Sequence, residues 1–195
     1  MDIEKLIQIR RNDMAPERGR ILISEPFMGD FYFGRSVVLL AEHNDEGSFG
    51  LIMNKPLYKP FNSIVADYPL FEAPVFIGGP VSSENLFFIH TLGKDIPESN
   101  EIIPGLYWGG EMEAVREMIL LRLIKPDQIR FYLGYSGWEA SQLAGELERN
   151  SWLVSTITAS SLLKTHPEKM WNRFMQRMGT AYDLWRQFPV NPQMN

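Results

Sequence analysis

Arg35 and Asn54 are residues whose types and placement could bind a ligand. Arg35 directly precedes an apolar run at 36–41, and Asn54 and Lys55 end the next such run. If the two runs form a hairpin, the three side chains lie at the same end of it. Donors placed together in this way bind a carboxylate or a phosphate. They could equally hydrogen-bond to neighbouring backbone carbonyls and hold the hairpin.

Two of the histidines could take part in the same site. His43 lies between Glu42 and Asn44, and either neighbour could select its tautomer and so prepare a general base. The alternative is an imidazole that caps a turn. His90 ends the apolar run at 87–89, where it could approach the same region or be a hydrogen-bonded core histidine.

No metal or cofactor site is expected. The chain has three histidines and no cysteine, and it contains no His-Glu-x-x-His spacing. It also has no P-loop and no dinucleotide-binding fingerprint. His166, next to Pro167, fits a helix cap.

A glycine pair and a serine offer two further possibilities. Gly78 and Gly79 could present N–H groups to an anion, although a tight turn between strands explains them as well. Ser136 lies between a predicted strand and a predicted helix but lacks the Gly-x-Ser-x-Gly spacing of a nucleophile elbow. Its place in Ser-x-x-Glu, ending at Glu139, favours helix capping.

These residues predict a polar cleft that recognises a small anionic ligand or a protein segment. Its candidate members are Arg35, His43, Asn44, Asn54, Gly78, Gly79 and His90.

Short runs of β-branched and large apolar residues must position this cleft. Strands are predicted at 20–24, 36–42, 49–54, 74–77, 86–91, 105–108, 128–135 and 152–154. Asp45, Glu46 and Gly47 supply a turn between the second and third strands, where the glycine allows a positive φ.

Helical spacing appears in four places. A short helix at 2–10 precedes the body, and a helix at 111–124, apolar nearly all round in its last turns, is expected to end deep in the core. A third helix follows Glu139, and the fourth, at 167–179, carries Trp171 and Phe174 on one face. Strands followed by appended helices predict an α+β fold with an antiparallel or mixed sheet.

Composition limits the class of protein. The chain has 195 residues, 45% hydrophobic and 22% charged, which suits one domain over 1–195, with 1–18 as a helical N-terminal extension and 189–195 as a loose tail. No apolar stretch is long enough for a membrane span, and the start lacks the order of a secretion signal. With no cysteine, the expected location is the cytoplasm. A net charge of −5 with scattered cations argues against direct nucleic-acid binding.

The chain resembles the YqgE/AlgH family in residues that occur in order between about 19 and 179. They are Pro26, Asp30, Phe33, Arg35 to Val38, Glu42 to Asn44, Gly47, Gly50, Asn54 to Pro56, Gly78 to Pro80, His90, Thr91, Gly134, Tyr135, Trp138, Gln142, Leu143, Glu146, Trp152 and Leu153. Ala144, Ser136 and Ser141 depart from the family, which often has glutamate, alanine and glycine there.

The resemblance implies a compact α+β fold whose bent sheet closes towards a pseudo-barrel. It implies no activity, although one branch is labelled a transcriptional regulator of exopolysaccharide synthesis. Three hypotheses follow: a regulatory or binding protein, a hydrolase with His43 as general base, and a transcriptional regulator that acts through a partner rather than on DNA.

Overall fold

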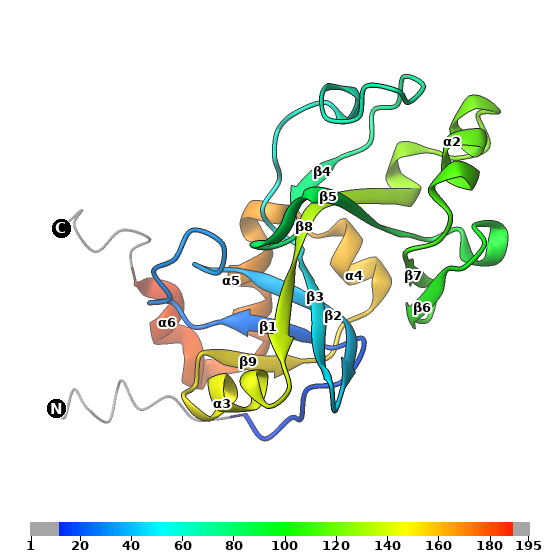
Figure 1. Ribbon diagram of the computed structural model, residues 1–195. Helices are drawn as coiled ribbons and strands as arrows, with labels where there is room; N and C mark the ends of the chain where they lie inside the picture. The colour runs from blue at the N-terminus through cyan, green and yellow to red at the C-terminus, as the bar shows by residue number, and fades with distance from the viewer. Residues whose placement is uncertain (1–11, 189–195) are drawn as a thin grey trace, which may run out of the picture.

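The structure, a computed structural model, describes residues 12–188, and this part of the chain folds into a nine-stranded mixed sheet with helices on its faces (Figure 1). The strand order is β6-β7-β5-β8-β3-β2-β1-β9, and β4 also pairs with β8, as the one parallel pair of this sheet. The α+β class and the bent, mostly antiparallel sheet are confirmed. The sheet stays open, because the path ends in β6 and β9 rather than closing into a barrel.

The strands are β1 (Ile21–Ser24), β2 (Val37–Asn44), β3 (Gly47–Ile52), β4 (Val75–Ile77), β5 (Val81–His90), β6 (Asn100–Ile103), β7 (Leu106–Trp108), β8 (Ile129–Glu139) and β9 (Trp152–Ser155). The helices are α2 (Met112–Leu120), α3 (Gln142–Glu148), α4 (Ala159–Lys164), α5 (Pro167–Arg177) and α6 (Asp183–Gln187), with short 3-10 turns at Phe61–Ser63, Gly93–Asp95, Pro126–Gln128 and Thr180–Tyr182.

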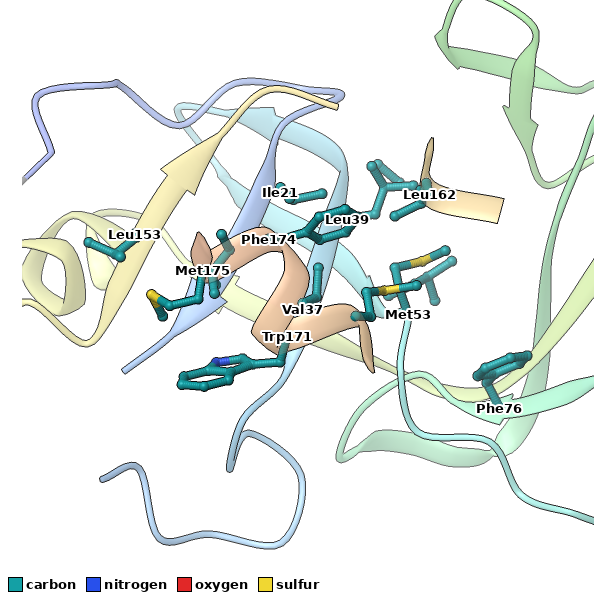
Figure 2. Packing of buried hydrophobic residues seen from close by; sticks show 14 of the residues in the cluster. Ile21, Val37, Leu39, Met53, Phe76, Leu153, Leu162, Trp171, Phe174 and Met175 are labelled. Carbon is teal, nitrogen blue, oxygen red and sulfur yellow. The ribbon is translucent and has the colours of Figure 1, made fainter. Parts of the chain in front are cut away.

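The strand β1 and the part of β2 from Val37 to Ala41 are buried on both faces. Val37 and Leu39 pack towards α5, whereas Val38 and Leu40 pack in a separate cluster on the opposite face, with α3. Side chains alternate across a strand, so a run covered on both faces must be apolar throughout. Figure 2 shows Phe174 of α5 beside the first of these faces.

β8 links the two parts of the sheet. Its first half pairs with β4 and β5, and its last residues, Ser136 to Glu139, pair with β3. A further core cluster packs α2 against β4, β5 and β8, at the end of the molecule away from α6 (Figure 1). One strand therefore connects two regions that have separate hydrophobic clusters.

Most predicted strands are confirmed, and so is the turn between β2 and β3. The side chain of Asn44 stabilises this turn by accepting hydrogen bonds from the N–H groups of Glu46, at 2.9 Å, and Gly47, at 3.2 Å. The last predicted helix is α5, which buries Trp171 and Phe174 as its spacing indicates.

The prediction that the helix at 111–124 ends deep in the core is wrong. α2 ends at Leu120, and Leu120, Leu121 and Leu123 are 56%, 67% and 63% exposed. The helix buries only Val115 and Ile119, so apolar residues around its other sides remain at the surface.

The capping box at Ser136 is also not formed. β8 continues through Ser136 to Glu139, because β3 supplies backbone partners there. The Ser136 hydroxyl donates to the carbonyl of Gly78 at 3.0 Å. The helix begins later, at Gln142, whose side chain accepts the N–H of Glu139.

The sequence patterns missed β6, α4, α6 and the first half of β5. The residues of β5 from Ser82 to Asn85 are polar, so they carry no strand signal. The helix predicted at 2–10 and the tail from 189 lie outside the described residues. Within 12–188 the structure has no helix long and apolar enough to span a bilayer.

Candidate functional site

The structure separates the predicted site residues into groups along the sheet. Arg35 and Asn54 lie at the open end of the β2–β3 hairpin, and His43 lies near its turn, about 25 Å away along the strand at 3.3 Å per residue. His90 pairs with Ile129 at the start of β8, whereas the partner of His43, Ser48, pairs with Trp138 near its end. The expected cleft does not gather these residues at one place.

Asn54 holds the open end of the hairpin. Its Oδ1 accepts the N–H of Val37 at 2.8 Å, and its Nδ2 donates to the carbonyl of Arg35 at 2.9 Å. Lys55 donates from Nζ to the carbonyl of Gly34 at 2.8 Å, and burial lowers its pKa although Asp30 opposes the shift. These contacts follow the structural alternative, in which the side chains satisfy backbone groups.

The Arg35 side chain also bonds within the protein. Its guanidinium carbon lies 4.9 Å from the ring centroid of Trp171, and Nη2 donates to the carbonyl of Phe188. Arg35 itself has φ of 50°, in the left-handed region. This arginine ties α5 and the segment after α6 to the start of β2.

The glycine pair permits close backbone approach. A Cβ on Gly78 would lie 2.1 Å from the carbonyl oxygen of Gly134, and one on Gly79 would lie 2.2 Å from the carbonyl of Tyr135. Gly78 receives the N–H of Ile52 and donates to the carbonyl of Leu133. The pair lets the chain pass between β3 and β8, which accounts for both glycines without an anion.

His43 is oriented by Ser48 rather than by its sequence neighbours. Nδ1 of His43 lies 2.7 Å from Oγ of Ser48 on the facing strand. Sequence reasoning did not identify this partner, because the contact depends on the register of the hairpin.

A hollow of about 570 Å³ lies beside this pair, at the turn end of β2 and β3 and the end of β8. We call it the hairpin hollow; it is lined by Glu42, Asn44, Glu46, Gly47, Ser48, Phe49, Val81, Tyr135, Gly137, Trp138, Glu139 and Gln142.

The electrostatics of the hairpin hollow are negative. Glu42, Glu46 and Glu139 line it, and no lysine or arginine does. In residues 12–188 no ion pair neutralises any of these three carboxylates. Such a lining opposes an anionic ligand.

Part of the lining of the hairpin hollow is aromatic, from Phe49, Tyr135 and Trp138. The rings of Phe49 and Tyr135 lie 4.8 Å apart, and Phe49 also stacks on Trp108 at 4.7 Å. Trp108 and Phe87 contact these rings but do not line the hollow themselves. The hollow therefore offers aromatic surface next to carboxylates.

Glu146 holds two tryptophan rings in place, one of which lines the hairpin hollow. Its Oε2 accepts the indole N–H of both Trp138, at 2.8 Å, and Trp152, at 2.7 Å, and its Oε1 accepts from Gln142. Sequence reasoning did not identify this role of Glu146. The sequence signal that could have pointed to it is that Glu146 is among the residues that carry the family resemblance.

His90 lies apart from the hollow and is 1% exposed. Nδ1 accepts the N–H of Leu92 at 3.3 Å, and Nε2 lies 3.0 Å from Oγ of Ser99. Burial lowers the pKa of His90 to about 4, although a backbone hydrogen bond at Gly109 opposes the shift. This imidazole is therefore neutral at neutral pH.

The profile of a family described as AlgH-like matches residues 21–183. The chain belongs to the AlgH-like family. Its relatives include a UPF0301 protein of Bacteroides thetaiotaomicron, 43% identical over 191 residues and 97% of each chain. A UPF0301 protein of Chlorobaculum tepidum is 36% identical over 177 residues, which cover 91% of this chain and 95% of that one.

Solved structures agree with the fold of this AlgH-like chain. The solution structure of AlgH from Pseudomonas aeruginosa matches with a TM-score of 0.70 and 27% identity, over 93% of this chain and 98% of that one. A crystal structure from Corynebacterium diphtheriae matches with a TM-score of 0.73 over 92% and 95%. Its identity is 23%, so it shows the fold alone.

Residues that carry the family resemblance gather at the hairpin hollow of this AlgH-like protein. Those that line it are Glu42, Asn44, Gly47, Tyr135, Trp138 and Gln142. Family membership alone assigns no chemistry, so the function is argued from this site. Across 12–188, no group of three or more histidine, aspartate and glutamate side chains is placed to hold a metal ion.

Proposed function

We propose that this AlgH-like protein is a binding protein whose hairpin hollow takes a lysine or arginine side chain of a partner polypeptide. The observation that supports this is the combination of carboxylates that lack a cation with aromatic walls in one hollow. Of the two ligands in the binding hypothesis, a small anion and a protein segment, this proposal takes the protein segment.

The chemistry of the lining suits such a side chain. An ammonium or guanidinium group gains from a carboxylate and from the face of an aromatic ring within about 6 Å. Its methylene stem covers apolar surface such as Phe49 and Val81. Each exposed ion pair contributes at most about 1 kcal/mol, so the affinity depends on charge and ring contact together.

The same charges disfavour other ligands of this hollow. Phosphate or nucleic acid would meet three carboxylates and no counter-charge from lysine or arginine. A regulatory role in transcription would therefore act through a partner protein.

The test measures binding of a minimal probe by nuclear magnetic resonance. N-acetyl-arginine amide is titrated into the protein, with N-acetyl-glutamine amide as the neutral probe of similar size. We expect the arginine probe alone to shift the amide signals of Gly47, Ser48 and Gly137, which line the hollow.

A charge-matched pair of variants separates the site from net charge. The triple change Glu42→Gln, Glu46→Gln and Glu139→Gln should weaken binding at least about tenfold. The control replaces exposed Glu72, Glu98 and Glu117 by Gln, which changes the net charge equally. Equal weakening in both variants, or equal shifts by both probes, would refute the proposal.

A second candidate function rests on the contact of 2.7 Å between His43 and Ser48. Here Oγ of Ser48 attacks an ester carbonyl while Nδ1 of His43 takes its proton and returns it to the leaving alcohol, and water then hydrolyses the acyl-serine. In the described residues no hydrogen bond orients His43 through Nε2, which favours binding over catalysis. A fluorophosphonate probe decides: labelling of wild type that Ser48→Ala abolishes would establish the hydrolase.

A further inference from the structure

The N-terminal end of β8 carries a second hollow, of about 330 Å³, at the opposite end of the strand from the hairpin hollow. Its walls include Pro74, Ile89, Ile129 and Leu163, so they are largely apolar. Arg130 lines it as well. We call it the Arg130 hollow.

Arg130 is a buried cation without a counter-charge. The residue is 9% exposed, and in the described part of the chain no carboxylate lies within ion-pair distance of it. Its guanidinium lies 4.5 Å from the ring centroid of Phe76, and Nη2 donates to the carbonyl of Leu163 over a long 3.3 Å. Nη1 is buried with no hydrogen-bond partner. Burying a charge in this way is costly unless an anion compensates it.

The titratable groups beside Arg130 do not supply that anion. Burial raises the pKa of Tyr132 to about 12, although the charge of Arg130 and a hydrogen bond with its side chain both act to lower it, so this phenol stays neutral. Its hydroxyl is directed to Sδ of Met53 at 3.3 Å. His90, in the lining, is neutral. Asp127 lines the hollow from an exposed position and forms no ion pair with Arg130.

We propose that the Arg130 hollow binds a small monocarboxylate with an apolar body. A guanidinium pairs with a carboxylate through two parallel N–H bonds, and Nη1 is a donor still free to do so. The apolar walls suit a short hydrocarbon group, and the volume lies at the lower end of ligand pockets. The negative charge of Asp127 disfavours a phosphate dianion.

Binding requires the guanidinium to turn towards the hollow, because Nη1 is shielded from solvent. The contact that breaks when it turns is the long hydrogen bond from Nη2 to the carbonyl of Leu163 in α4. Occupancy of the hollow is thereby linked to the C-terminal end of α4. This proposal is independent of the hairpin hollow.

The experiment is a titration followed by nuclear magnetic resonance, with 4-methylpentanoate as probe, 4-methylpentanamide as its uncharged analogue and inorganic phosphate as competitor. We expect the carboxylate to shift the side-chain Nε–H signal of Arg130 and the backbone signals of Ile129 and Leu163, and the amide to bind at least about tenfold more weakly.

Two variants complete the test. Arg130→Met keeps the volume but removes the charge and should abolish binding. Arg130→Lys keeps the charge but cannot form two parallel N–H bonds to one carboxylate, and it should weaken binding at least about tenfold. If Arg130→Met does not fold, the comparison of carboxylate and amide on wild type decides. Equal binding of the two probes, unchanged binding in a folded Arg130→Met, or tighter binding of phosphate would each overturn the proposal.

Discussion

The carboxylate of Glu146 lies 2.7 Å from the indole Nε1 of Trp152, which is 2% exposed. The same oxygen accepts the indole N–H of Trp138, a wall of the hairpin hollow. A single glutamate on α3 thus satisfies two buried donors and fixes the rings on which β8 and β9 pack together.

Replacement of Glu146 should destabilise the fold. In Glu146→Ala both indole N–H groups lose their acceptor, and each buried unsatisfied donor costs about 1–3 kcal/mol. We expect the free energy of unfolding, measured in urea, to fall by about 2–6 kcal/mol. Glu148→Ala is the matched control, because Glu148 is exposed on the same helix. A similar small change in both variants would show that Glu146 is not structural.

His90 should make stability depend on pH. Burial lowers its pKa from 6.5 to about 4, so between these values the unfolded chain binds more protons than the folded one. The stabilisation is complete above pH 6.5 and is lost as the pH falls towards 4, by up to about 3 kcal/mol. Urea unfolding across this range measures it. His90→Gln should flatten the slope and His166→Gln, at an exposed position, should not; an unchanged slope in His90→Gln would assign the effect to other groups.

Two glycines should respond oppositely to alanine. In Gly78→Ala the new Cβ would meet the carbonyl oxygen of Gly134 at 2.1 Å, so β3, β4 and β8 must separate, at a cost above about 3 kcal/mol. Gly145 lies within α3, where a Cβ meets only Nη1 of Arg149 at 3.5 Å. Gly145→Ala should stabilise the protein by about 0.5–1 kcal/mol. Thermal unfolding of both variants tests this, and a tolerated Gly78→Ala would contradict the packing described for β8.

The end of α2 should carry backbone strain. Arg122 has φ of 57° and donates its N–H to the carbonyl of Ile119, while Leu123 donates to Met118, the pattern of a Schellman cap that favours glycine. Arg122→Gly should be more stable than Arg122→Ala by about 1 kcal/mol. Both variants remove the same charge, so their difference in urea unfolding reports the backbone alone. Equal stability would mean that the turn relaxes without the cap.

Predictions from sequence succeeded where the signal was local. The continuous apolar run at Val37 to Ala41 and the helical stripe of Trp171 and Phe174 depend on residues a few positions apart, and both predicted elements are confirmed. The Ser-x-x-Glu pattern failed because Ser136 finds its partners in β3 and at Gly78, far away in the chain. The leucines that end α2 were placed in the core because periodicity reports apolar residues, not whether another element covers them.

The sequence by itself determined the α+β class, the hairpin of β2 and β3 with its turn, and the residues that mark the family. Only the tertiary structure decided which polar residues meet. The start of β8 pairs with His90 of β5, whereas its other end pairs with Ser48, the β3 partner of His43. The same pairing brings Glu42, Glu46 and Glu139 around aromatic rings from β3 and β8. Such groupings depend on strand pairing between distant segments, and the free energy that selects that pairing comes from burial of the whole sheet.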